Sequence, residues 1–299
     1  MKKIIALVSF MCIFLLAACQ SDSTQPESKK KSGDHKIASM SIHLTNDLLA
    51  LGVTPAGSVV GGELKDFLPH VKNQLKDTKK LGPASDPDME ALLELNPDNI
   101  YLDKEFAGKD VSKYKKIGNT HVFDLDKGTW RDHLTDLIGK IVNREKEAKT
   151  FIQDYEDETK QVRSMMNKEL GKNAKVMAIR VNAKELRVFS TRRPMGPILF
   201  DDLKLKPADG IKEMNTSRPY EVISQEVLPD YNADAIFVVV NRDDKSQQAY
   251  KELQKSAVWK GLKAVKANHV YKIADQPWLD YSALGNKLAM DEAKKLFQK

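Results

Sequence analysis

The sequence predicts an α/β protein with two lobes that contain mainly parallel sheets and are joined by one long rigid helix. Residues 90–102 can be laid over residues 226–238 without a gap, and Glu, Leu, Asn, Asp and Ile coincide. Each copy indicates a short amphipathic helix, a turn at Asn-x-Asp and a buried strand, which is the rhythm of parallel α/β units. Two copies this far apart predict two similar lobes and not a solenoid of short repeats.

The chain begins with the pattern of an export signal. Lys2 and Lys3 precede the uncharged apolar run 4–16, which is shorter than the ~20 residues that cross a bilayer. The run ends in Leu-Ala-Ala before Cys19, which is the pattern of a bacterial lipobox. We expect residues 1–18 to be a lipoprotein signal peptide and Cys19 to carry the lipid. An ordinary signal peptide with an incidental cysteine is the alternative.

A polar segment follows the lipobox. Residues 19–35 are rich in Ser, Lys, Asp, Glu and Gln, so they cannot bury enough surface to offset their ordering entropy, and we expect a flexible tether. Cys12 leaves with the signal, so the folded body has neither a disulfide nor a thiolate metal site. Removal of the signal also removes Lys2 and Lys3, which lowers the formal charge of +6 by two. Nucleic acid is not an expected partner of an exported protein.

The folded body divides into two lobes and a connecting helix. Residues 144–170 contain no Gly or Pro, carry apolar residues at helical spacing, and would form a helix ~40 Å long. Gly171 stands where a helix-terminating glycine is expected. A coiled coil is the alternative, but the apolar pattern lasts less than four heptads. We expect an N-lobe at 36–143, a helix at 144–171 and a C-lobe at 172–299. The expected strands are 36–40, 56–60, 100–102, 121–123, 176–181, 187–190, 236–240 and 270–273.

Four motifs in chain order carry a family resemblance. They are Leu-Leu-Ala-Leu-Gly-Val-Thr-Pro at 48–55, Leu-Gly-Pro at 81–83 with residues 87–98, Trp130 with Ile-Gly-Lys-Ile at 138–141, and residues 256–271. With them the chain resembles the class III substrate-binding proteins of ABC importers, which handle ferric siderophores, haem and cobalamin. The resemblance implies two α/β lobes joined by one long helix. The Pro-x-x-Pro-Lys-Arg leader common in this family is missing.

The resemblance also implies a contact with the importer. In the family, a glutamate at the top of each lobe docks onto arginines of the two permease subunits, and these positions match Glu90 and Glu226. Each acid could instead complement a helix N-terminus, which is worth a few tenths to about 1 kcal/mol. That alternative explains either residue, but not both at matching positions of the repeat.

A ligand of such a protein lies in the cleft between the lobes. A ferric siderophore of the catecholate or citrate type is anionic, and arginine can grip its oxygens without losing charge. Such cations should follow the strands, where α/β clefts open. Arg180, Arg218 and Lys104 match basic residues of catecholate-binding relatives, whereas Ala84 and Asn182 stand where further cations are expected. The candidate cations are Arg180, Arg218, Lys104, Arg192 and Arg193, and the alternative for each is a solvated surface cation.

Aromatic side chains would form the rest of the pocket. Trp278 and Tyr281 lie in a loop after the last expected strand, and Tyr220 lies beside Arg218. His43 follows the first expected strand, at the edge of the cleft. These aromatic rings could either flank a ligand or pack their own loops.

Other functions are weighed on the same residues. A metal-ion receptor would need several His and carboxylate ligands, but His35 falls in the tether and His70 and His133 fall in apparent surface helices. Haem remains open, because Tyr220 or His43 could be its axial ligand. The arginines argue against cobalamin.

An enzyme or a scaffold protein is less consistent with the sequence. We find no Gly-x-Ser-x-Gly, His-Glu-x-x-His or P-loop motif, and Asp201-Asp202 is explained as a capping and surface feature. A scaffold would not need two lobes with matched glutamates. We therefore expect a monomeric receptor without cofactor, resident metal or catalytic residues, on the outer face of a Gram-positive-type cell membrane. It would deliver a ferric siderophore to an ABC permease and its ATPase, and citrate-hydroxamates stay open beside the anionic types.

Overall fold

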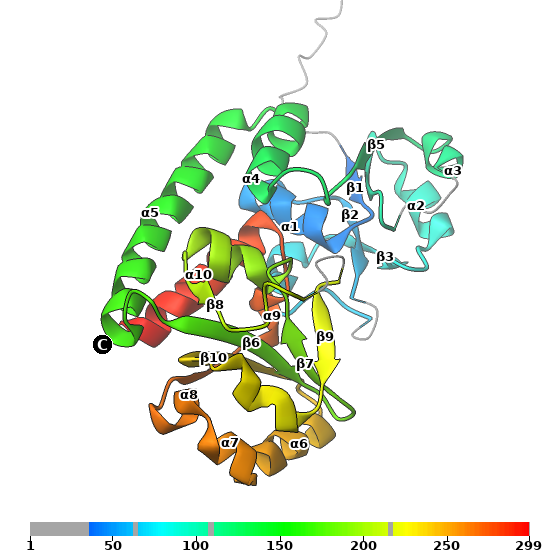
Figure 1. Cartoon of the computed structure of the whole chain (residues 1–299). Helices are drawn as coiled ribbons and strands as arrows, with labels where there is room; N and C mark the ends of the chain where they lie inside the picture. The colour runs from blue at the N-terminus through cyan, green and yellow to red at the C-terminus, as the bar shows by residue number, and fades with distance from the viewer. Residues whose placement is uncertain (1–35, 62–64, 107–110, 215–217, 299) are drawn as a thin grey trace, which may run out of the picture. The chain divides into compact units, whose positions relative to one another are not determined.

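The computed structural model describes residues 36–61, 65–106, 111–214 and 218–298 (Figure 1). The expected signal peptide, the lipid-bearing Cys19 and the tether lie outside this part of the chain. Among the described residues, no helix combines the length and the apolar character needed to cross a bilayer.

The N-lobe is built on a parallel sheet with the strand order β3-β2-β1-β4-β5. Its strands are β1 (Ile37–Ser39), β2 (Gly57–Val60), β3 (Lys79–Pro83), β4 (Asn99–Asp103) and β5 (Asn119–Phe123). Its helices are α1 (Ile42–Ala50), the 3₁₀ helix η1 (Lys72–Leu75), α2 (Met89–Leu95), α3 (Ser112–Lys115), α4 (Trp130–Asp132) and the π-helix η2 (His133–Gly139). Four strands match the sequence analysis within two residues. The strand β3 was not predicted, and Leu81 is its one buried residue.

The C-lobe is built on a mixed sheet with the order β11-β10-β6-β7-β9, and β8 pairs with β6. Its strands are β6 (Lys175–Val181), β7 (Leu186–Phe189), β8 (Lys206–Pro207), β9 (Tyr220–Ile223), β10 (Ala235–Val240) and β11 (Val270–Ile273). Its helices are η3 (Pro197–Asp202, a π-helix), the 3₁₀ helix η4 (Gln225–Tyr231), α6 (Asp244–Lys255), α7 (Ala257–Gly261), α8 (Lys263–Lys266), α9 (Asp275–Trp278) and α10 (Ala283–Phe297). Among the described strands of this lobe, β7 pairs antiparallel with β6 and β9 and the other pairs are parallel, so the mainly parallel prediction is confirmed.

The sequence repeat has the same backbone geometry in both lobes. Asn96 and Asn232 each end their helix in the left-handed region, at φ 47° and 46°. Two residues later, Asp98 accepts the backbone N–H of Lys36 at 2.8 Å, and Asp234 accepts that of Lys175 at 2.7 Å. Each aspartate thereby holds its strand against the start of the neighbouring strand, β1 or β6.

The two copies differ in the type of helix. The first copy is the α-helix α2, as predicted. The second copy is the 3₁₀ helix η4, which contains Pro229. Proline has no N–H to donate and its ring clashes with the preceding turn, so the short helix predicted there is not an α-helix.

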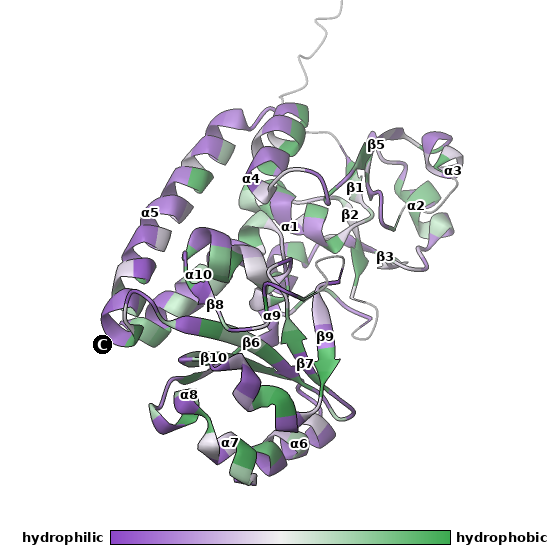
Figure 2. Cartoon of the chain, in the orientation of Figure 1, coloured by the Kyte–Doolittle hydropathy of each residue, from purple (hydrophilic) through white to green (hydrophobic). Residues whose placement is uncertain are grey.

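The connecting helix α5 runs from Glu145 to Leu170 and ends at Gly171, where φ is 89°. It is mostly hydrophilic (Figure 2) and buries one stripe against the long helix α10 and η2. Tyr155 on this stripe donates its hydroxyl to Asp202 at 2.7 Å. Arg131 pairs with the same carboxylate at 2.9 Å. The expectation that Asp202 is a surface feature is therefore wrong: it is buried and joins α4, α5 and η3.

Candidate ligand-binding site

The carboxyl ends of strands from both lobes border a cavity of about 440 Å³. The N-lobe contributes Gly61 after β2, with Leu68 and Pro69. The C-lobe contributes residues from the ends of β6, β10 and β11, namely Arg180, Asn241, Arg242, Asp243, Asp275, Gln276 and Leu279. A cavity at this edge is where open α/β sheets bind ligands.

Two arginines in this cavity are held in fixed orientations. Arg180 donates from Nε to the side-chain oxygen of Asn241 at 2.7 Å. Arg242 pairs with Asp275, with 2.7 Å between the guanidinium and the carboxylate. Arg180 was among the predicted ligand residues, whereas Arg242 was missed. Its position directly after the buried strand of the second repeat was the available signal.

A second cavity of about 180 Å³ lies beside the first helix of the N-lobe. Three predicted ligand residues line it: His43, Arg193 and Tyr281. The rings of His43 and Tyr281 stack with their centroids 3.5 Å apart, and the Arg193 guanidinium carbon lies 4.1 Å from the centre of the Tyr281 ring. We call these three residues the interlobe stack, because His43 belongs to α1 of the N-lobe and the other two belong to the C-lobe.

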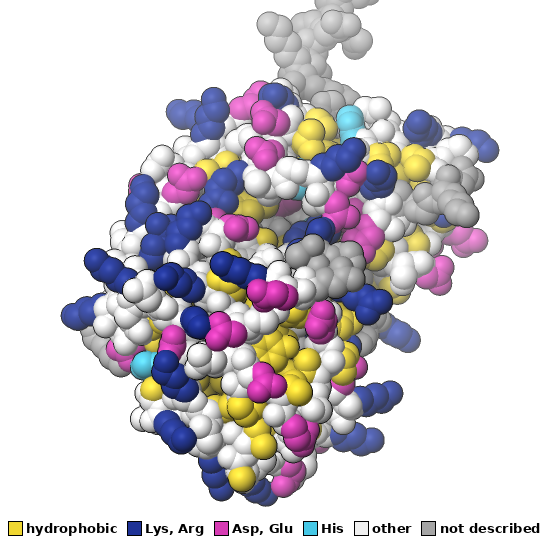
Figure 3. All heavy atoms as spheres, in the orientation of Figure 1, with side chains coloured by type: hydrophobic (Ala, Val, Ile, Leu, Met, Phe, Trp, Pro, Cys, Tyr) yellow, Lys and Arg dark blue, Asp and Glu magenta, His cyan; other side chains and the backbone are white. Residues whose placement is uncertain are grey.

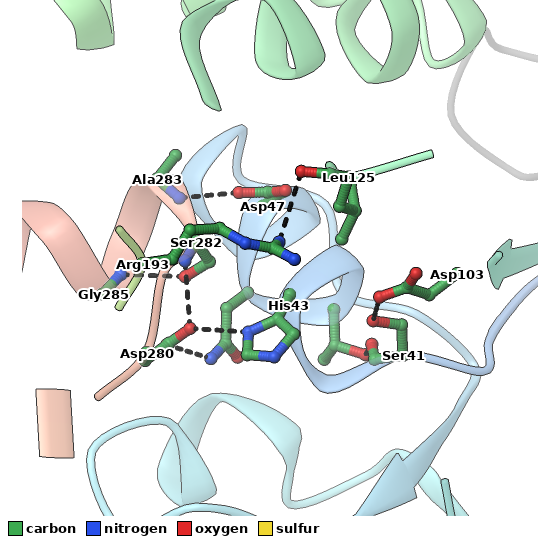
Figure 4. Close-up of polar contacts among 12 residues, drawn as sticks. Ser41, His43, Asp47, Asp103, Leu125, Arg193, Asp280, Ser282, Ala283 and Gly285 are labelled. Atoms are coloured by element: carbon green, nitrogen blue, oxygen red, sulfur yellow. Dashed lines mark hydrogen bonds and ion pairs between the residues drawn. The ribbon is translucent and has the colours of Figure 1, made fainter. Parts of the chain in front are cut away.

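Both ends of the interlobe stack are held by the protein (Figure 4). Arg193 reaches into the N-lobe, where it donates to the backbone oxygen of Leu125 at 3.2 Å and to Asp126 at 2.7 Å. His43 lies 3.2 Å from a carboxylate oxygen of Asp280 through its Nδ1 atom. The interlobe stack therefore contacts the N-lobe at both of its ends, through His43 at one end and through the partners of Arg193 at the other.

Asp280 is the central acid of the contact between the lobes, and sequence analysis missed it. Its side chain is 0 % exposed and also accepts from Asn46 at 2.5 Å and His70 at 3.2 Å. Burial raises its pKa, but the hydrogen bonds from the two histidines outweigh burial and hold the pKa of Asp280 well below its usual range. Because an ionised carboxylate only accepts, His43 Nδ1 and His70 Nε2 are the protonated nitrogens.

Asp47 on α1 is a second buried acid at this contact. It accepts the backbone N–H of Ala283 at 2.7 Å, at the start of α10. Burial raises the pKa of Asp47 to about 8, the hydrogen bond from Ala283 opposes this, and the nearby charge of Asp280 adds to it. Asp47 is thus largely protonated at neutral pH.

The remaining predicted cations line neither of these two cavities. Lys104 is exposed and pairs with Asp124 at 2.8 Å. Arg192 is exposed and lies 3.7 Å from Asp126. Arg218 is exposed at the turn before β9. Figure 3 shows basic and acidic side chains interspersed on the visible face of the molecule.

Two of the predicted aromatic residues have packing contacts in place. Tyr220 is half-buried beneath the guanidinium of Arg187, 4.1 Å from its ring centre. Trp278 is 0 % exposed, packs against Phe237 and donates its ring N–H to Glu292 at 3.0 Å. The expectation that Trp278 contacts a ligand is corrected, because its ring belongs to the core and borders neither cavity.

Two histidines expected on surface helices are also placed differently. His70 is largely buried by its contact with Asp280, and His133 is buried beside the backbone oxygen of Lys127. In the described residues, no group of three or more His, Cys, Asp or Glu side chains could hold a metal ion.

The candidate docking glutamates are both exposed, on the first turns of α2 and η4. Each has an exposed apolar neighbour: Leu93 near Glu90 is 62 % exposed, and Val227 beside Glu226 is 36 % exposed. Hydrogen bonds from its own backbone N–H and from Ser224 and Gln225 lower the pKa of Glu226, so this residue is ionised at neutral pH.

Two α/β lobes on one helix, with a cavity between their strand ends, define a two-lobed substrate-binding protein. The periplasmic binding protein family model matches residues 37–277, and the chain belongs to this family. This confirms the resemblance found in the sequence, and the family consists of binding proteins and not of enzymes.

Three relatives illustrate the family. The iron-uptake system-binding protein of Bacillus subtilis is 28% identical over 295 residues, covering 91% of this chain and 90% of that protein. The structure of this protein, FeuA, with ferri-bacillibactin covers 89% of this chain and 94% of its own, with a TM-score of 0.72. SirA of Staphylococcus aureus with staphyloferrin B is 27% identical, with a TM-score of 0.75 over 87% of this chain and 92% of its own. The high-affinity heme uptake system protein IsdE of S. aureus is 26% identical over 96% of this chain and 94% of its own.

Proposed function

We propose that the chain captures a ferric siderophore in the cleft between its lobes and delivers it to an ABC permease for iron uptake. The observation that carries the proposal is the 440 Å³ cavity at the strand ends, into which Arg180 and Arg242 are fixed by neighbouring side chains. Prepositioned guanidinium groups suit the carboxylate or catecholate oxygens of an anionic ferric complex.

An anionic catecholate or citrate-type complex is the favoured ligand. The relatives support this class, because FeuA is described with a triscatecholate siderophore and SirA with staphyloferrin B. Haem is the weaker alternative, since the ring of His43 is stacked on Tyr281 and one of its nitrogens is engaged by Asp280.

A fluorescence titration tests the proposed ligand. Binding is followed as quenching of the tryptophan emission of the protein, and Trp130 lines the smaller cavity. The probes are ferri-bacillibactin, ferric staphyloferrin B, ferric citrate, ferrioxamine B, haem and cobalamin. We expect saturable, tight binding of at least one anionic ferric siderophore. Saturable tight binding of haem alone would contradict the siderophore assignment.

Docking to the permease is assigned to Glu90 and Glu226. Their matching positions in the two lobes, their exposure and their apolar neighbours Leu93 and Val227 support a contact with two similar permease subunits. In cells, Glu90→Ala with Glu226→Ala should abolish uptake of the siderophore and leave its Kd unchanged. Glu94→Ala with Asp230→Ala, on the same two helices, is the matched control that should retain uptake. Equal uptake by both double variants would contradict the assignment.

The chain is proposed to act as a monomer tethered to the outer face of the cell membrane. The lipobox pattern supports lipidation of Cys19 after removal of residues 1–18, and the polar composition of residues 19–35 supports a tether. The lobes would span 36–143 and 172–299, on either side of the helix at 144–171. Detergent phase partitioning of the mature protein checks the lipid: the wild type should enter the detergent phase and Cys19→Ala the aqueous phase. Wild type in the aqueous phase would argue against lipidation.

A further inference from the structure

Asp280 is a buried carboxylate whose side-chain partners belong to the other lobe. It accepts from His43 and Asn46 on α1 and from His70, and its own segment adds the backbone N–H of Ser282 at 3.1 Å. Removing an ion from water costs several kcal/mol, which only well-placed hydrogen bonds offset. An apolar side chain would fill this space at lower cost, so the carboxylate is suited to fixing an orientation.

The orientation that Asp280 fixes is that of the His43 ring. One face of this ring lies against Tyr281, the residue that follows Asp280, at an interplanar angle of 27°. Tyr281 in turn carries the Arg193 guanidinium, 4.1 Å from its ring centre, in a cation–π contact. Asp280 therefore acts on Arg193 through two stacked rings.

Arg193 is where this chain of contacts reaches the cavity. With His43 and Tyr281 it lines the 180 Å³ cavity, and its side chain is 25 % exposed, so it is held but remains in contact with solvent. A long arginine side chain loses conformational entropy when it grips an anion, and a side chain that is already ordered loses less.

We propose that the anionic ferric ligand also reaches the 180 Å³ cavity that Arg193 lines, and that Asp280 is a positioning residue, which holds Arg193 toward this ligand through the interlobe stack. The inference deepens the proposed function and rests on it. Asp280 is buried and would not touch the ligand, but part of the affinity that Arg193 provides would depend on it.

A double-mutant cycle on ligand affinity tests the proposal. The Kd of ferric staphyloferrin B or ferri-bacillibactin, whichever the wild type binds, is measured for Asp280→Asn, Arg193→Ala and the double variant. Asp280→Asn should weaken binding about tenfold alone and cause no further loss once Arg193 is replaced. Additive losses would overturn the proposal. Asp291→Asn on α10, which pairs with Lys287, is the control that should leave Kd unchanged.

Replacements within the stack separate positioning from general destabilisation and remain informative if Asp280→Asn does not fold. Tyr281→Leu should lose about as much affinity as Asp280→Asn, whereas Tyr281→Phe keeps the stacked ring and should lose less. His43→Phe keeps a ring but loses the hydrogen bond to Asp280, and should also weaken binding. If Tyr281→Leu binds as tightly as Tyr281→Phe, the stack does not position Arg193.

A readout without ligand distinguishes failure of this inference from failure of the proposed function. The same cycle is measured by urea unfolding of the mature protein, where Asp280→Asn and Arg193→Ala should be coupled. If the wild type binds no ferric siderophore, the proposed function fails, and the unfolding cycle alone decides the positioning role. Additive unfolding effects would then overturn that role as well.

Discussion

Asp47 makes the stability of this protein depend on pH in a way that one substitution should remove. The side chain is buried on α1 and accepts the Ala283 N–H at 2.7 Å. Burial raises its pKa from 3.8 to about 8. In Asp47→Asn, the amide oxygen can still accept this hydrogen bond, but the side chain cannot ionise. The variant therefore removes the titration and keeps the shape.

The size of the effect follows from the difference between the two states. Below about pH 4, Asp47 is protonated in both the folded and the unfolded chain. As pH rises toward 8, the unfolded chain loses this proton while the folded chain keeps it, so stability falls by about 1.4 kcal/mol per pH unit. Between pH 5 and pH 7, Asp47→Asn should therefore gain about 3 kcal/mol relative to the wild type.

Urea unfolding at pH 5, 6, 7 and 8 measures this difference. All other titratable groups are the same in both proteins, so pH effects that do not involve Asp47 largely cancel in the comparison. Asp154→Asn, an exposed position on α5, is the control that should show a constant difference. A constant difference between Asp47→Asn and the wild type across this range would refute the reasoning, because Asp47 would then be ionised in the folded state.

Three further predictions concern the cleft, the core and the repeat. Arg180→Ala should weaken an anionic ferric ligand more than tenfold in the fluorescence titration; unchanged affinity would remove Arg180 from the site. Trp278→Ala should lower the free energy of unfolding by about 3–5 kcal/mol, as for a fully buried aromatic residue; a loss below 1 kcal/mol would contradict its place in the core. Asp98→Ala and Asp234→Ala should each cost about 0.5–1.5 kcal/mol, because each removes one hydrogen bond to a backbone N–H; a loss at one site and none at the other would argue against their equivalence.

Periodic and repeated features were predictable from the sequence. The 26-residue helix α5 has a continuous apolar stripe and a terminal glycine, and both are local signals. The repeat located β4 and β10 because each strand is buried along its centre. The edge strands β5 and β11 were predicted, but the edge strands β3 and β9 were not: β9 contains no fully buried residue, and Val222 in it is 56 % exposed.

The candidate site was only partly predictable, because its contacts join distant parts of the chain. Rules for cations after strands found Arg180 and Arg193, and both border a cavity. No local pattern pairs His43 or His70 with Asp280, since these residues are more than 200 positions apart in the chain and meet only when it folds. A buried acid between two lobes looks, in sequence, like any polar loop residue.

The matched bonds of Asp98 and Asp234 have a consequence for engineering. Each lobe closes its own central strand pair with residues from one side of α5, so neither sheet borrows a strand from the other. A chain opened near Gly171 would yield two fragments that each keep a whole sheet, with α10 and Asp280 on one fragment and their partners on the other. The end of α5 is therefore a suitable place to divide the protein for a split sensor, in which reassembly of the two fragments would report the captured ligand.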